Sequence, residues 1–340
     1  MKKVALEHAV GEVLGHDITE VNLEHGRKGV AFRRGHVVEA GDLKTMKNLG
    51  KRHIYVWEGN ENQIHEDDAA RTLAPLIAGE GIRFDPEPHE GKIGFYAARS
   101  GIFKVDVARL ERINAFAIPS LPTIHNNFPV TSAKQVAAFR IIPLSCAPEV
   151  IEHIKAELLE PLLYVKPYEV EQASILVTGN EVYHGHIRDG FTPQLQRKLQ
   201  CFGVEISTAE VLPDVQHTIS RAVKEAVART RLVLVTGGTS VDPDDVTVQA
   251  MKEAGVVFPF QGNPIQPGNN MTIGYKDNTS VVAVPAAALF FATTALDIFL
   301  PRMLAGERID ASELVRRGHG GLCHFCSHCV YPMCPFGVVG

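Results

Sequence analysis

The stretch Leu234–Thr247, which reads LVTGGTSVDPDDVT, decides the fold of the chain. Its first residues close a short apolar run, Leu232–Val235, which is typical of a buried parallel strand. Gly237 and Gly238 follow at once, and because glycine has no Cβ, the backbone N–H groups of such a turn can approach an anion. A helix predicted to begin near Val246 adds its positive N-terminal end at the same place. The stretch therefore predicts a phosphate-binding turn.

Three carboxylates complicate this turn. Asp242, Asp244 and Asp245 stand beside the predicted phosphate site and would repel an anion. A bound Mg²⁺ resolves the conflict, since it prefers oxygen ligands and bridges carboxylates to phosphates. The alternative is that Asp244 or Asp245 simply caps the following helix. The sequence leaves both interpretations open.

A second turn, TGNE, mirrors the first at the end of an earlier apolar run. Its Glu181, together with Asp189 further along the loop, is a candidate metal ligand, and Arg188 is a candidate phosphate contact. His184 and His186 lie in the same loop, where histidines are more typical of solvated positions than of metal ligands.

Strands and helices alternate outward from these turns. The helical spacing of Ile219, Ala222, Val223 and Ala226 indicates one apolar face. Alternating βα units predict a parallel sheet with helices on both faces, which binds ligands beyond the carboxyl ends of its strands. The strands are expected at about 174–177, 204–207, 232–235 and 281–284, and the helices at about 192–202, 215–229 and 246–253.

The rest of the chain divides into three further sections. Residues 1–60 are predicted to form a β-rich module, with short strands at 30–32, 36–38 and 53–56 and one helix near 41–49. Residues 61–168 are a mixed α+β section, with strands near 92–96 and 137–143 and helical periodicity at 105–113 and 148–163. The α/β domain covers 169–310, and a Cys-rich tail covers 311–340.

Composition excludes several classes of function. The chain has 340 residues, is 45% hydrophobic and carries a net charge of −5, which argues against nucleic-acid binding as its main work. The N-terminus has no continuous apolar segment typical of a signal peptide, which places the protein in the cytoplasm. The apolar run at 280–296 is interrupted by Pro285, so it is expected to form a strand, a turn and a buried helix rather than a membrane span.

Four cysteines crowd the tail with the spacing C-x2-C-x2-C-x4-C-P: Cys323, Cys326, Cys329 and Cys334. In a chain without a secretion signal such a cluster favours metal over disulfides. A similar run binds iron–sulfur clusters in ferredoxins, whereas structural zinc usually draws two separated pairs of ligands. A [4Fe–4S] cluster, zinc and metal-free reactive thiols all stay open. Cys146 and Cys201 are expected to be small core residues.

At this point the residues carry a resemblance. The pattern ILVTGNEVYHGHIRD…LVTGGTSVDPDDVT…PGNNM…VVAVPA resembles the gephyrin-type molybdopterin-binding domain over about 135 residues. The leading AVGEVLGHDIT is similar to the start of molybdopterin molybdenumtransferases, and the whole chain with its tail resembles a bacterial molybdopterin-binding family associated with molybdenum hydroxylases. The resemblance implies a three-layer α/β domain with a mostly parallel sheet. It also implies that adenylylated molybdopterin and molybdate meet over Mg²⁺, where the nucleotide is cleaved off.

The resemblance assigns roles residue by residue. Catalytic roles fall on Asp245, Asp242 and Glu181, and Mg²⁺ ligation on Glu181, Asp189 and Asp245. Cofactor binding falls on Thr178, Gly179, Arg188, Thr236, Gly237, Gly238, Thr239, Ser240, Pro267 and Gly268.

Two departures from the transferase pattern stand out. Asn269 occupies the position of a lysine in the usual Pro-Gly-Lys-Pro, which removes a point charge for phosphate or molybdate. Ala286–Ala288 replaces the Gly-Asn-Pro of the usual Leu-Pro-Gly-Asn-Pro, which removes an amide donor.

Three hypotheses follow for the whole protein. It is a molybdopterin molybdenumtransferase, a non-catalytic carrier that delivers the cofactor to a molybdenum hydroxylase, or a redox or structural module whose working part is the tail. The resemblance also implies a homodimer.

Overall fold

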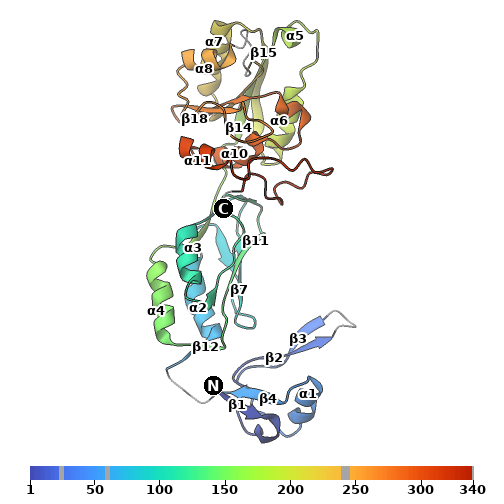
Figure 1. Cartoon of the computed structure of the whole chain (residues 1–340), viewed down its shortest axis with the longest axis vertical. Coiled ribbons are helices and arrows are strands. Elements are labelled where there is room, and N and C mark those ends of the chain that lie inside the picture. The colour runs from blue at the N-terminus through green and yellow to red at the C-terminus, as the bar shows by residue number, and fades with distance from the viewer. Residues whose placement is uncertain (23–26, 58–61, 239–245, 339–340) are drawn as a thin grey trace. The chain divides into compact units, whose positions relative to one another are not determined.

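The computed structural model describes residues 1–22, 27–57, 62–238 and 246–338 (Figure 1). The chain divides into two units. The first comprises residues 1–98, 105–126 and 133–164, and the second comprises 99–104, 127–132 and 165–340. Among the described residues no helix is long and apolar enough to cross a membrane.

The first unit begins with a small β-rich module. Strand β1 (Lys2–Ala5) pairs antiparallel with β4 (His53–Val56), and β2 (Ile18–Asn22) forms a hairpin with β3 (Arg27–Phe32). The short helices are η1 (Leu6–His8) and α1 (Asp42–Asn48). Their core is a cluster of buried apolar side chains: Leu6, Ala9, Leu14, Ile18, Val38, Met46, Ile54 and Val56.

The remainder of the first unit mixes helices and strands. Its four-stranded sheet has the order β6-β7-β11-β9, from Ile82–Phe84, Ile93–Ala97, Gln135–Ile141 and Pro119–Ser120. A two-stranded pair joins β5 (Ile64–His65) to β12 (Ser145–Cys146). The helices are α2 (Glu66–Ile77), α3 (Val107–Asn114) and α4 (Pro148–Glu157).

The second unit holds the α/β domain and one small additional sheet. The small sheet has the order β10-β8-β13, from Pro129–Val130, Gly101–Val105 and Leu163–Lys166. The main sheet has five strands in the order β15-β14-β16-β18-β17: Glu205–Leu212, Gln172–Thr178, Leu232–Thr236, Thr279–Val284 and Thr272–Lys276. Only β17, at one edge, runs antiparallel to its neighbour.

Alternation along β16 shows why this domain has three layers. Leu232 and Leu234 pack in a buried cluster with α6 (Phe191–Gln200) and α10 (Ala295–Leu304). Val233 and Val235 point to the other face, where α7 (Gln216–Val227) and α8 (Thr247–Glu253) cover the sheet. Successive side chains of a strand face opposite sides, so a wholly apolar strand needs cover on both. Figure 1 shows these helix layers beside the strands. The predicted three-layer, mostly parallel α/β fold is confirmed.

Two predicted elements of the first half are wrong in extent. Residues 36–38 form only an isolated bridge, Val13 with Val37, because Gly35 turns the chain just before them with a φ of 84°. The helix predicted over 148–163 ends at Glu157. Pro161 lacks an N–H and disfavours helical backbone in the residue before it, so the chain leaves the helix and enters β13.

The apolar run after β18 forms two helices rather than the single buried helix that was predicted. Helix α9 (Ala287–Phe290) ends after one turn, and α10 begins at Ala295. Thr294 begins the second helix and forms a capping box with Asp297. The side chain of each residue accepts a hydrogen bond from the backbone N–H of the other. The short segment between the helices matters below, since it lines a cavity.

Candidate functional site

The candidate site lies where the direction of chain winding changes. From β14 the chain passes through α6 to β15, on one side of β14 in the sheet, and then returns to β16 on the other side. Helix α6 covers one face and α8, which follows β16, covers the opposite face. The loops after β14 and β16 therefore diverge and leave a crevice at the carboxyl ends of the strands, where open α/β sheets bind ligands.

A cavity of about 780 Å³ occupies this crevice. Residues from several separate loops line it: Thr178, Gly179, Glu181, Val182, Ile187, Arg188, Gly190, Phe191, Asp214, Gly237, Gly238, Gly268, Asn269, Asn270, Pro285, Ala286, Ala287 and Leu289. The structure thus brings together these predicted site residues: Thr178, Gly179, Glu181, Arg188, Gly237, Gly238 and Gly268.

Other predicted site residues lie elsewhere. Thr236 is fully buried one residue before the cavity wall, and Pro267 lies next to Gly268, which lines the cavity. Thr239, Ser240, Asp242 and Asp245, together with Asp244, fall outside the described residues.

The turn after β16 is fitted against the end of β14. Gly237 has a φ of 81°, and a Cβ built on it would lie 2.1 Å from the carbonyl oxygen of Thr178. Only glycine fits here. The hydroxyl of Thr178 also bonds the hydroxyl of buried Thr247, at 3.1 Å, where α8 begins. Gly237 and Thr247 are therefore both held close to Thr178, at the end of β14.

One polar atom at this turn lacks a partner. The Oγ1 atom of Thr236 is buried and has no hydrogen bond to any other described residue. A buried hydroxyl without a partner costs free energy, so such atoms deserve an explanation. An additional polar group at the turn would supply one.

The loop after β14 brings a carboxylate that the sequence did not reveal. Helix α5 (Asn180–Tyr183) begins directly after Gly179. The Asn180 N–H donates to Asp214 Oδ2 at 2.9 Å, and the Asp214 N–H donates to Asn180 Oδ1 at 3.2 Å. This reciprocal pair joins the loops after β14 and β15, and Asp214 lines the same cavity as Glu181. A parallel pairing of β14 with β15 was the only signal that could have suggested it.

Asp189 has a structural partner of its own. Its Oδ1 accepts hydrogen bonds from the N–H groups of Phe191 (2.8 Å) and Thr192 (3.1 Å), at the first turn of α6. A carboxylate at a helix start satisfies otherwise unpaired N–H groups. Asp189 thereby fixes the loop that carries Arg188, whose exposed side chain lines the cavity. His184 and His186 are both exposed, with ring centroids 6.1 Å apart.

The rest of the described cavity wall carries no charged side chain, and hydrogen bonds fix its backbone at Pro267 and Gly268. Gly268 has a φ of 107°, and its carbonyl accepts a hydrogen bond from the side chain of buried Asn263 at 3.0 Å. The carbonyl of Pro267 accepts from Ala295 N at 3.0 Å. Asn269 lines the cavity where the transferase pattern has lysine, and Ala286 lines it where that pattern has glycine. Both sequence departures therefore face the candidate ligand space.

The described lining residues include two acidic side chains, Glu181 and Asp214, and one basic side chain, Arg188. Two carboxylates beside an anion would repel it unless a cation intervened. Among the described residues no set of three His, Cys, Asp or Glu side chains is arranged to hold a metal ion.

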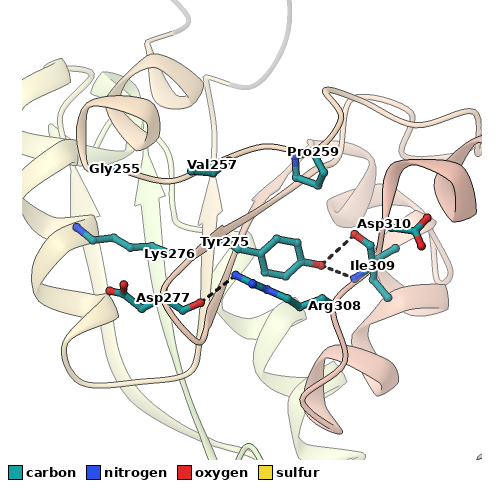
Figure 2. A pocket seen from close by; sticks show the side chains of 9 residues that line it. All are labelled: Gly255, Val257, Pro259, Tyr275, Lys276, Asp277, Arg308, Ile309 and Asp310. Atoms are coloured by element: carbon teal, nitrogen blue, oxygen red, sulfur yellow. Dashed lines mark hydrogen bonds between the residues drawn. The ribbon is translucent and has the colours of Figure 1, made fainter.

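A different cavity, of about 690 Å³, lies beside edge strand β17 (Figure 2). None of the predicted site residues lines it, and its polar groups bond one another. Tyr275 Oη accepts from Ile309 N at 2.6 Å, and Arg308 stacks on the Tyr275 ring while donating to the carbonyl of Asp277 at 2.9 Å. These contacts hold the segment before α11 (Ala311–Arg316) against β17, which is a structural role.

The four tail cysteines also meet at a cavity, one of about 290 Å³. None of them is in a disulfide. Cys326 and Cys329 are exposed, and Cys323 and Cys334 are partly buried. Of the two cysteines predicted to be core residues, Cys146 is buried as expected, whereas Cys201 is exposed.

These features define a three-layer α/β domain with a cavity at its switch point. Residues 174–305 match the family described as a probable molybdopterin binding domain. Residues 3–58 match a family described as a domain of unknown function.

Individual relatives share only part of the chain. A CinA-like protein of Desulfosudis oleivorans is 38% identical over 82 residues, which are 24% of this chain and 20% of the relative. A protein of Pyrobaculum calidifontis is 35% identical over 82 residues, or 24% of this chain and 31% of the relative. The chain thus spans less than a third of the length of these curated relatives.

Among solved structures, the chain is similar to the protein CinA of Thermoplasma acidophilum, with 18% identity and a TM-score of 0.35, covering 39% of this chain and 98% of that one. It is also similar to the tungsten cofactor synthesizing protein MoaB of Pyrococcus furiosus, with 16% identity and a TM-score of 0.33, covering 41% and 99%.

Proposed function

We propose that the switch-point cavity binds adenylylated molybdopterin and that the protein assists Mg²⁺-dependent insertion of molybdate during molybdenum cofactor biosynthesis. The observation that carries this proposal is the convergence of the two glycine turns, after β14 and β16, on one cavity with Glu181 and Arg188. A family match to a molybdopterin-binding domain over the same residues supports the choice of ligand.

The cavity fits a phosphorylated ligand in two respects. Gly237 leaves no side chain between its own backbone and the cavity, so N–H groups there can approach an anion. Arg188 adds a planar cation that suits phosphate oxygens. In this proposal the glycine turns and Arg188 bind phosphate and orient the pterin.

The same cavity fits a magnesium ion. Mg²⁺ keeps several waters and needs only one or two protein carboxylates together with ligand phosphates. Glu181 and Asp214 would supply them from the described residues, and Asp242 and Asp245 would join them from the segment that is not described. Asp189 would act by holding its loop in place rather than as a direct ligand. When bound, the ion supplies positive charge against the phosphates.

A carrier without catalytic activity is the second candidate. It is favoured by the uncharged wall at Asn269 and Ala286. Asn269 supplies no cation at the position where the transferase pattern has lysine, and Ala286 stands where that pattern has glycine. In that case the protein holds the pterin cofactor without cleaving off the nucleotide and delivers it to a molybdenum hydroxylase. In either case we propose a homodimer, which light scattering on the purified protein would test.

One experiment distinguishes the transferase from the carrier. The full chain is incubated anaerobically with adenylylated molybdopterin, molybdate and Mg²⁺, and AMP release is followed by chromatography. A transferase releases AMP, stops when Mg²⁺ is chelated, and loses at least about a hundredfold of its rate in Asp245→Asn. A carrier binds the compound without releasing AMP. If the wild-type chain neither binds nor cleaves it, the proposed function is wrong.

Arg188→Ala is expected to raise the Kd for adenylylated molybdopterin about tenfold, because one charge-assisted phosphate contact is lost. Isothermal titration would measure it. Arg221→Ala is the matched control, since Arg221 is exposed on α7, pairs with Glu225 and does not line the cavity. Equal affinity in the two variants would show that Arg188 does not contact the ligand.

A further inference from the structure

The Cys-rich tail packs against the α/β domain and bonds to it. Its first residues pair with the segment before the Pro267 turn: Cys323 N donates to Gln266 O at 2.8 Å, and Gln266 N donates to Gly321 O at 2.7 Å. Further on, Tyr331 Oη donates to the carbonyl of Asp297 at 3.0 Å. Phe336 is buried in the core. The positions of the cysteines therefore follow from packing against the domain.

All four tail cysteines line one cavity together with aromatic side chains. Its walls include Phe291, Phe325 and Tyr331, besides the segment from Phe290 to Thr293. Thiols that serve only as small apolar residues pack into a core and leave no shared space. Four thiols around a common cavity with an apolar shell instead resemble the surroundings of a metal centre.

The volume of the cavity that the four thiols line favours a cluster over a single ion. A zinc ion draws four sulfurs to about 2.3 Å from one point, so a zinc site closes on itself. In a [4Fe–4S] cluster each thiolate binds a different iron, so the sulfurs stand apart around a filled volume. The cavity of about 290 Å³ that all four cysteines line provides that volume.

Two polar groups already approach the sulfurs. The Phe325 N–H donates to Cys323 Sγ at 3.4 Å, and the Thr293 hydroxyl lies 3.2 Å from Cys329 Sγ. Hydrogen bonds to sulfur stabilise the thiolate form and tune iron–sulfur clusters. Phe325 has a φ of 51°, an uncommon conformation for a residue with a side chain, and this turn aims its N–H at the sulfur.

We propose that Cys323, Cys326, Cys329 and Cys334 bind a [4Fe–4S] cluster in this cavity. The site does not depend on the proposed function of the switch-point cavity. One continuous segment nevertheless reaches both cavities: Pro285–Ala287 and Leu289 line the switch-point cavity, and Phe290–Thr293 line the cluster cavity. The cluster is therefore expected to fix the segment 285–293, which carries the alanines that replace the transferase glycine.

The full chain purified without oxygen tests the site. We expect about four irons and about four sulfides per chain, with broad visible absorption that bleaches on reduction with dithionite. Zinc without iron or sulfide would overturn the proposal. So would failure to form the cluster when the protein is supplied with ferrous iron and sulfide.

Two variants make the test specific. Cys326→Ser is expected to lose the four-iron signal while circular dichroism stays unchanged, because Cys326 is exposed and its substitution leaves the core intact. Cys201→Ser is the matched control, since Cys201 is also exposed but lies at the end of α6 and outside the cavity. A full cluster in Cys326→Ser, or equal loss in both variants, would contradict the four-thiolate site.

Hydrogen exchange tests whether the cluster fixes the segment 285–293. Peptides covering 285–293 are expected to exchange several-fold more slowly in the cluster-loaded wild type than in Cys326→Ser, while peptides from α7 are unchanged. Equal exchange of 285–293 in a loaded and an unloaded chain would show that the cluster does not fix this segment.

Discussion

Gly237→Ala is expected to abolish ligand binding at the switch-point cavity and to lower the free energy of unfolding by about 3 kcal/mol. Two effects add. At a φ of 81° a residue with a side chain is strained, and the new Cβ would lie 2.1 Å from the carbonyl oxygen of Thr178. Because Thr178 ends the central strand β14, its carbonyl cannot move freely. The turn after β16 must therefore shift, and with it the N–H groups that we expect to face phosphate.

Gly203→Ala is the control for this prediction. Gly203 has a φ of 74°, and a Cβ there would meet nothing within 4 Å. That variant carries backbone strain alone, about 1 kcal/mol, and should bind as the wild type does. Denaturant titration gives the stabilities, and anaerobic calorimetry with adenylylated molybdopterin gives the affinities. If Gly237→Ala loses no more stability than the control and still binds, the turn is not constrained as described.

Glu307→Gln is expected to destabilise the second unit by about 3 kcal/mol. Glu307 is largely buried and pairs with Lys104 at 2.8 Å and with Arg302 at 2.6 Å. The network continues from Arg302 to Glu313 and from there to Arg317, which bonds the carbonyl of Gly337 in the tail. Neutralising Glu307 removes the carboxylate that pairs with largely buried Lys104 and leaves Arg302 with Glu313, which costs far more than losing an exposed pair.

The loss of stability in Glu307→Gln should depend on pH. Burial tends to raise the pKa of Glu307, but the hydrogen bond from Lys104 and the charge of Arg302 outweigh it and hold the pKa below its ordinary value of 4.5. The carboxylate therefore stabilises the folded state fully above pH 4.5, and this contribution disappears as the pH falls through the lowered pKa. The difference between wild type and Glu307→Gln should shrink in the same range.

Glu169→Gln is the control, because the Glu169–Arg231 pair is exposed and should contribute less than about 1 kcal/mol. Unfolding should be followed by circular dichroism, since the single tryptophan, Trp57, lies in the first unit. A loss in Glu307→Gln no larger than in the control would show that the network is not an important source of stability.

Much of the α/β domain could be predicted from periodicity alone. All side chains of the apolar run in β16 are buried, and so is the apolar face of α7. Local sequence and tertiary packing therefore favour the same structure. Edge strand β17 was missed. Its residues, TIGYK, lack a long apolar run, and its pairing with β18 depends on a hairpin turn in which Asp277 adopts a φ of 52°.

The site was predictable where its residues follow strands directly. Gly179 and Gly237 could be placed together because parallel strands end at one edge of a sheet. Asp214 could not, since its position depends on a reciprocal bond with Asn180 across two loops. The sequence likewise offered Asp189 as a metal ligand without revealing that its carboxylate bonds the start of α6. Long-range loop contacts of this kind have no periodic signature.

The central claim is that the switch-point cavity binds a phosphorylated pterin. Its most direct test is anaerobic calorimetric titration of the full chain with adenylylated molybdopterin in the presence of Mg²⁺. We predict saturable binding at one site per chain, weakened about tenfold in Arg188→Ala and lost in Gly237→Ala. The absence of saturable binding to the wild-type chain, or equal affinity in the wild type and both variants, would contradict the claim.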